Sequence, residues 1–213
     1  MNRLSKTLLG VGLALGVSLG AVAIAAPYIA LRGSFAFAED AETRISGVPL
    51  RASLDTGWGV SGAFGNEFGP VHLEFEGVYR GFATDRIINN GVATAAAADL
   101  ALMAPMANVI VDLPLDDYML GSTVRPYIGA GIGGVYAQLH PTVGGSPLIE
   151  DDGWGFAYQF MGGVAVPVMN NVTMRMGYRY FAAPNVKFHA AGGAPFKTDL
   201  EVHSVDIGFD FRF

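Results

Sequence analysis

An apolar residue stands at every second position in the last nine residues of the chain. The apolar positions are Val205, Ile207, Phe209, Phe211 and Phe213, and Asp206, Gly208, Asp210 and Arg212 lie between them. Successive side chains of a β-strand point to opposite faces, so this segment predicts a strand with one apolar and one polar face. Such a strand suits a wall between lipid and a polar interior.

The same alternation recurs earlier in the chain, in segments bounded by turn-forming residues. Counting the C-terminal one, the pattern predicts eight strands, at about residues 28–37, 55–64, 71–80, 101–113, 125–136, 154–168, 172–180 and 205–213. Each is long enough for a tilted strand to cross a bilayer, and an even number is what a single-chain bacterial barrel needs. We therefore expect an all-β fold, an eight-stranded antiparallel up-and-down transmembrane β-barrel.

The connections between these segments alternate in length. Residues 39–54, 84–100, 140–153 and 182–200 are predicted as long loops, whereas 66–70 and 169–171 are tight and 116–124 is intermediate. Bacterial barrels have short periplasmic turns and long external loops. The alternation predicts that both ends of the barrel sequence face the periplasm.

The N-terminal segment has the pattern of a secretory signal peptide. Arg3 and Lys6 precede an apolar run at 8–24, and Ala23-Ile24-Ala25 supplies small residues for cleavage after Ala25. The alternative is a retained membrane helix, because the run is almost long enough to span. We expect a cleaved signal peptide at 1–25, a barrel domain at 26–213, and a location in the outer membrane of a Gram-negative bacterium.

The apolar residues are dispersed along the chain and do not form a long continuous run after the N-terminal segment. Hydrophobic residues make up 51% of the chain, yet no run of about 18 apolar residues follows Ala26. The chain has no cysteine, which excludes disulfides and cysteine metal sites. The chain has 13 basic and 19 acidic residues, and removal of Arg3 and Lys6 with the signal peptide leaves 11 basic ones. The resulting net charge near −8 argues against nucleic acid as a partner. No cofactor motif is present.

The predicted inward faces carry opposite charges in nearly balanced number. They are Arg32, Glu74, Glu76, Arg80, Asp112, Arg125, Arg175, Arg179, Asp206, Asp210 and Arg212. An eight-stranded barrel is only wide enough for side chains to fill it or to hold one small ligand. We expect a paired network that plugs the interior, with Gly129, Gly131 and Gly133 leaving room for arginine side chains. The alternative is a narrow, porin-like channel for small solutes or ions lined by the same charges.

Aromatic residues fall at the predicted external ends of the outward faces. They are Phe37, Trp58, Tyr79, Tyr136, Trp154 and Tyr180. Aromatic rings favour the headgroup level of a membrane, so this set predicts an aromatic girdle. The alternative is a soluble lipocalin-like barrel or β-sandwich with these rings in its core.

Several short motifs carry a resemblance to a known family. Gly57-Trp58-Gly59, residues 125–131 (RPYIGAG), residues 177–180 (GYRY) and the strand that ends in phenylalanine are similar to the OmpA-like, opacity-protein type of small outer membrane β-barrel of proteobacteria. The resemblance implies an eight-stranded barrel in contact with outer membrane lipid and lipopolysaccharide. It also implies that Phe209, Phe211 and Phe213 form a signal read by the barrel assembly machinery.

Enzymatic activity is not expected. Lipid A deacylases, the relevant enzymes among small outer membrane barrels, use a His and a Ser two residues apart on one face of a strand. Here His203 and Ser204 are adjacent, so alternation sends them to opposite faces. The other histidines show no metal-ligand spacing, and we expect His72 to be an inward side chain near the periplasmic end.

The predicted external loops hold the remaining candidate features. Glu150-Asp151-Asp152 is either a solvated charge run or a divalent-cation site, and Arg44, Arg51 and Lys187 are candidates for contact with phosphates. Residues 87–91, 95–98 and Pro195-Phe196 are unusually apolar, which favours packing of the loops on one another or contact with a host or neighbouring surface. We expect a structural or surface-interaction role, with a channel as the alternative and a lipid A-modifying enzyme as a distant one.

Overall fold

The computed structural model describes residues 25–38, 41–45, 48–52, 56–89, 92–113, 124–143, 146–147, 151–189 and 195–213. The predicted signal peptide, apart from Ala25, lies outside them. The long strands are β1 (Ala26–Ala38), β4 (Thr56–Phe68), β5 (Val71–Asn89), β6 (Val92–Asp112), β7 (Arg125–Val143), β9 (Asp151–Met169), β10 (Val172–His189) and β11 (Pro195–Arg212). Short strands are β2 (Ala41–Ile45), β3 (Val48–Ala52) and β8 (Ser146–Pro147). Nowhere in the described ranges is there a helix capable of crossing a membrane.

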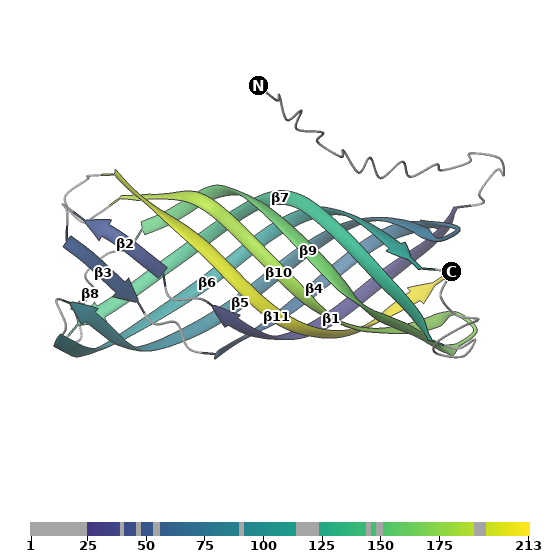
Figure 1. Cartoon of the computed structure of the whole chain (residues 1–213), viewed down its shortest axis with the longest axis horizontal. Coiled ribbons are helices and arrows are strands. Elements are labelled where there is room, and N and C mark those ends of the chain that lie inside the picture. The colour runs from purple at the N-terminus through teal and green to yellow at the C-terminus, as the bar shows by residue number, and fades with distance from the viewer. Residues whose placement is uncertain are drawn as a thin grey trace, which may run out of the picture.

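The long strands form one closed antiparallel sheet (Figure 1). The first and last strands pair from Tyr28↔Arg212 to Ala38↔Val202, and β5 pairs with β6 over its whole length. Closure leaves the backbone N–H and C=O groups of the wall paired, which lipid requires because it offers no hydrogen bonds. The predicted eight-stranded antiparallel barrel is confirmed.

Side chains alternate between the outside of the barrel and its interior. On β11, Val205, Ile207 and Phe209 are 53%, 47% and 41% exposed, whereas Asp206 and Gly208 between them are buried. Large apolar side chains on the other strands are exposed in the same way, for example Phe75 at 49% and Phe160 at 56%. This arrangement is the opposite of a soluble barrel, whose apolar faces point inward.

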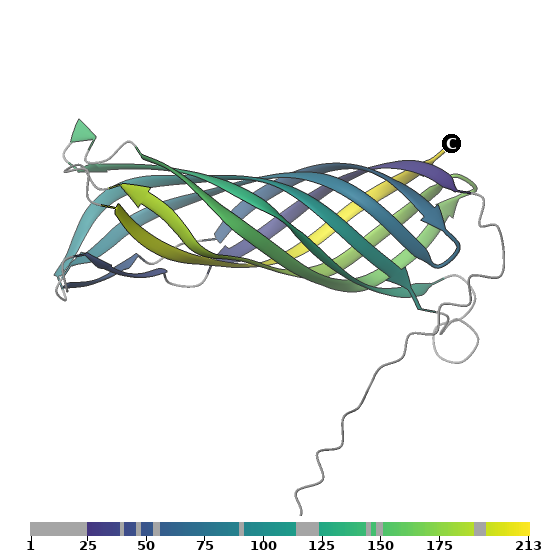
Figure 2. The same cartoon turned by 90° about the horizontal axis from the view of Figure 1, so that it is seen from above.

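The predicted long loops are largely wrong. Strands continue through most of 84–100, 140–153 and 182–200, and residues 39–54 contain the β2–β3 hairpin. The reason is physical: in this part of the barrel apolar side chains such as Val186, Phe188 and Leu200 pack in the interior, so the backbone ladder continues although apolar and polar residues no longer alternate. The elongated barrel of Figures 1 and 2 follows from this extension.

The two ends of the barrel differ. At one end lie the start of β1, the C-terminus and the tight turns that follow β4 and β9; at the other lie β2, β3 and β8 (Figure 2). Gly69, in the turn after β4, has a φ of 63°, a left-handed conformation that glycine adopts without strain. Short turns on the side of the termini are typical of the periplasmic end of a bacterial barrel.

Close packing inside the wall predicts that two glycines differ in how well they tolerate substitution by alanine. A Cβ at the inward Gly163 would overlap the Met176 carbonyl oxygen and the Gly177 Cα, both backbone atoms, whereas a Cβ at the outward Gly33 meets nothing within 4 Å. We expect Gly163→Ala to lower the free energy of unfolding by more than about 2 kcal/mol and Gly33→Ala to change it little. Heat-dependent gel mobility and urea titration measure both, and equal stability of the two variants would contradict the packing.

Candidate functional site

The centre of the barrel holds an ion-pair cluster around Glu76, a fully buried side chain on β5. Arg179 Nη1 lies 2.8 Å from Glu76 Oε2, and Arg179 Nε lies 2.6 Å from Asp206 Oδ2. The amides of Asn108 and Gln159 donate to Glu76 Oε2 at 2.9 and 3.1 Å. These side chains come from β5, β6, β9, β10 and β11, so the cluster ties opposite walls together.

A second cluster lies nearer the end that carries the termini. Arg32 contacts Glu74 at 2.6 Å, and Glu74 also accepts a hydrogen bond from the Tyr28 hydroxyl at 3.1 Å. In the same layer Arg175 bridges two carboxylates, Asp210 at 2.5 Å and Asp112 at 2.9 Å. These are short charge-assisted contacts among buried groups, where an unpaired charge costs several kcal/mol.

Two predicted members of the charge network and one histidine lie at its margins. His72 is buried, with its Nε2 3.3 Å from Asp112 Oδ2, as expected for an inward side chain. Arg125 lies 4.0 Å from Asp112, and Arg212 lies 3.6 Å from Glu67. Both arginine side chains are a quarter or more exposed, so these contacts contribute little to stability.

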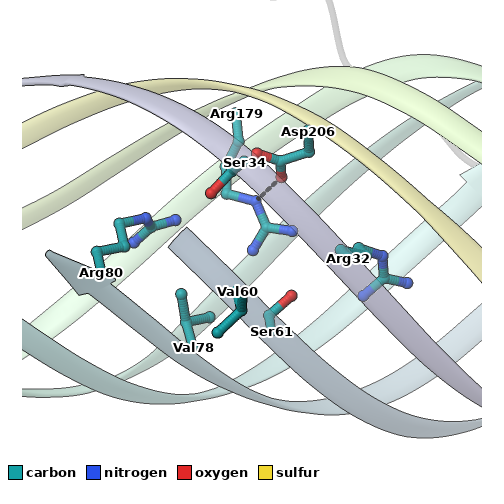
Figure 3. A pocket seen from close by; sticks show the side chains of 8 residues that line it. All are labelled: Arg32, Ser34, Val60, Ser61, Val78, Arg80, Arg179 and Asp206. Carbon is teal, nitrogen blue, oxygen red and sulfur yellow. Dashed lines mark hydrogen bonds and ion pairs between the residues drawn. The ribbon is translucent and has the colours of Figure 1, made fainter. Parts of the chain in front are cut away.

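Arg80 is buried but is not brought into an ion pair with any described residue. Its Nε and Nη1 have no hydrogen-bond partner, and its guanidinium lies 4.8 Å from the centre of the Phe181 ring. A cavity of about 10 Å³, room for about one water molecule, separates Arg80 from the Arg179–Asp206 pair (Figure 3). Arg80 therefore marks the boundary of the charged layers.

Beyond Arg80, away from the termini, the interior is apolar. The buried cluster that fills it begins beside the charged layers at Val78 and Met106 and consists of Ala36, Val78, Phe82, Leu100, Leu102, Ala104, Met106, Val135, Ala137, Ala157, Phe181, Ala183, Val186, Phe188, Leu200 and Val202. Sequence reasoning missed it because apolar residues on both faces break the alternation. The sequence signal that could have found it is the spacing along each strand, because side chains an even number of positions apart share a face. Phe181 and Val202 stand an even number of positions from the inward residues Arg179 and Asp206.

The expected purpose of three inward glycines is wrong. A Cβ at Gly131 would overlap the Asn108 amide, and one at Gly129 would crowd Met161 and Ile110. At Gly133 a Cβ would overlap the Pro105 carbonyl and press on Met106. The glycines make room for an amide and apolar side chains, not for arginines.

The six aromatic residues of the predicted girdle occupy outward positions of their strands. Phe37, Trp58 and Trp154 are exposed, and Tyr79, Tyr136 and Tyr180 are half-buried. Neighbouring rings touch, with centroids 5.8 Å apart for Trp58–Tyr79 and 4.7 Å apart for Tyr136–Trp154. Their place at a headgroup level remains a prediction, as does recognition of Phe209, Phe211 and Phe213 by the assembly machinery.

Among the described residues, the adjacent His203 and Ser204 are not brought to one face of their strand. Ser204 is buried inside, whereas the ring of its neighbour His203 contacts the outward Tyr178 and Tyr180, so the two point to opposite faces as predicted. Among the described residues no group of three His, Asp or Glu side chains is arranged to hold a metal. The side chains of Glu150-Asp151-Asp152, Arg44, Arg51, 87–91, 95–98 and Pro195-Phe196 lie outside the described ones.

Comparison with known proteins agrees with this geometry. A family model described as the outer membrane protein beta-barrel domain matches residues 8–213. An outer membrane protein of Gluconacetobacter diazotrophicus is 28% identical over 184 residues, which cover 77% of this chain and 48% of that protein. The chain thus spans about half the length of the curated relative it matches.

Solved structures share the fold at low sequence identity. Neisserial surface protein A superposes with a TM-score of 0.56 at 18% identity, covering 88% of this chain and 97% of that one. OprG, an outer membrane protein from Pseudomonas aeruginosa, superposes with a TM-score of 0.51 at 14% identity, covering 89% and 97%.

The central ion pairs predict unequal effects of removing two glutamates from the same wall. Glu76→Ala leaves Arg179 and two amides with fewer acceptors in a buried site, so we expect a loss of roughly 3–5 kcal/mol. Glu67→Ala removes only a partly exposed contact at 3.6 Å, and a loss below about 1 kcal/mol is expected. Urea unfolding in phospholipid vesicles measures both, and a tolerated Glu76→Ala would contradict the network's role.

Proposed function

The chain belongs to the outer membrane protein beta-barrel domain family, and from this membership we propose that it is a closed, non-conducting scaffold of the outer membrane with a structural or surface-interaction role. Its location in the outer membrane follows from the family and from the relative described above. The proposal concerns what the barrel does there: its interior is sealed, and its extended far end presents the contact surface.

The observation that carries the proposal is the layered filling of the interior. Two charged layers, around Glu74 and around Glu76, are followed by the apolar cluster that contains Phe82 and Phe181. A path for ions must pass all three, and the apolar layer offers no group to replace lost hydration water. The narrow bore of an eight-stranded barrel supports the same reading.

The likeness to the OmpA-like, opacity-protein type supports a surface-interaction role. In such barrels a rigid wall displays the external segments, which is where binding function concentrates. Here β5, β6, β10 and β11 continue through most of the residues expected to be external loops, and the β2–β3 hairpin lies at the same end (Figure 1). On this proposal the barrel assembly machinery reads the last strand, and a host or neighbouring cell-surface ligand meets the hairpins.

A narrow channel is the second candidate function. What favours it is the cavity beside Arg80, whose unpartnered guanidinium nitrogens suit water. Conduction then requires rearrangement of the apolar layer as well as of the ion pairs.

Conductance across a planar lipid bilayer separates the two functions. We expect the folded barrel, and the outward control Phe75→Ala, to show no steady conductance above the bare membrane. Truncating the apolar layer with Phe82→Ala and Phe181→Ala is expected to produce measurable ion flux, because it opens space above the Arg80 cavity. Steady, ohmic conductance by the unaltered protein would overturn the closed scaffold.

The surface role has its own test. Replacing residues 41–52 by a short turn removes β2 and β3 and leaves the closing β1–β11 ladder in place. Cells that display this variant should keep a heat-modifiable barrel and lose adhesion to surfaces that bind the intact protein. Undiminished adhesion would remove the hairpin from the proposal.

A further inference from the structure

Four residues on adjacent strands form a continuous row on the outside of the barrel. Tyr136 on β7 pairs with Trp154 on β9, Trp154 pairs with Lys187 on β10, and Lys187 pairs with Lys197 on β11. Two aromatic residues are thus followed by two cations along one line across the wall. Lys187 and Trp154 are 33 positions apart in the sequence, so only the register reveals this arrangement.

All four side chains are directed outward. Trp154 is 65% exposed, Lys187 and Lys197 are exposed, and Tyr136 is half-buried against the Trp154 ring at a centroid distance of 4.7 Å. Their inward neighbours are apolar: Val186 and Phe188 flank Lys187 and belong to the interior cluster. The row therefore faces the surroundings of the barrel, not its interior.

The two lysines face each other as like charges, an arrangement that destabilises a strand pair. No described carboxylate lies within ion-pairing distance of either one. The nearby outward acids are engaged elsewhere: Asp199 accepts a hydrogen bond from the Asn185 backbone N–H at 2.7 Å, and Glu201 accepts one from the Tyr180 hydroxyl at 2.9 Å. An anion held between Lys187 and Lys197 would relieve the repulsion.

The height of the row indicates which anion is available. Lys187 pairs with Trp154, so the two lie at the same level of the wall, on the side of Tyr180 that faces away from the termini. Trp154 belongs to the outward aromatic set, which favours the membrane interface. Cations at that level on the outer side meet the headgroups of the external leaflet, whose phosphorylated glycolipid is lipopolysaccharide.

We propose that the row Tyr136–Trp154–Lys187–Lys197 binds a phosphorylated glycolipid of the outer leaflet. Lys187 and Lys197 share one of its phosphate groups through charge-assisted hydrogen bonds, and the Trp154 and Tyr136 rings pack against the adjoining apolar part of the lipid. This site lies on the outer wall, so it holds whether or not the interior conducts.

Fluorescence of Trp154 reports directly on this site. The chain has two tryptophans, and Trp58→Phe leaves Trp154 as the only one. The full-length protein, folded in zwitterionic detergent micelles, is titrated with bisphosphorylated lipid A, with the dephosphorylated lipid, with phosphatidylglycerol and with inorganic phosphate. We expect a saturable change in emission with bisphosphorylated lipid A at the lowest concentration of the four.

Matched variants distinguish a specific effect of the two lysines on lipid A binding from an effect of the overall charge of this face. Lys187→Gln with Lys197→Gln should weaken lipid A binding roughly tenfold to thirtyfold, and the two Lys→Arg substitutions should preserve it. Asp199→Asn with Glu201→Gln alters charge on the same face and should not weaken binding. Heat-modifiable gel mobility verifies that each variant is folded.

Three results would overturn the proposal. They are equal affinity for phosphorylated and dephosphorylated lipid, undiminished binding by the folded double glutamine variant, and equally tight binding of phosphatidylglycerol or inorganic phosphate. The last result would assign the lysine pair to anions in general and not to a glycolipid.

Discussion

Closure of the sheet by the β1–β11 ladder is the constraint on which the rest of the structure depends. A curved sheet with free edges would leave backbone groups unpaired in hydrocarbon, at a cost of several kcal/mol each. Once Tyr28 pairs with Arg212 and Ala38 with Val202, each of the eight long strands has two neighbours. The period of two along each strand then separates an outside that meets lipid from an inside that meets only other side chains.

The interior follows from this separation. Charged residues directed into a narrow cylinder have no bulk water to solvate them, so most of them are paired there, as Arg179 is with Glu76 and Asp206. Apolar residues directed inward beyond the charged layers pack on one another, as Phe82 and Phe181 do. Arg80 lies where the two regimes meet, stacked on Phe181 and beside a small cavity.

The sequence was most informative where lipid imposes alternation. Segments such as 71–80 and 205–213 predicted strands, faces and inward charges correctly, because a wrong side chain there meets hydrocarbon. Prediction failed above the lipid, where β5, β6, β10 and β11 continue through residues expected to be loops. The hydrogen bond between Asn108 and Gln159 inside the barrel and the pairing of Lys187 with Lys197 on its outside depend on register and closure, which no single segment encodes.

Accessibility along β11 tests the central claim most directly. Because the native chain has no cysteine, single cysteines at positions 203–211 can each carry a spin label in a folded barrel in lipid vesicles. The account predicts a period of two, with labels at 205, 207 and 209 most accessible to oxygen dissolved in lipid and labels at 204, 206 and 208 shielded from it. Uniform accessibility, or the opposite phase, would contradict a closed wall with lipid outside.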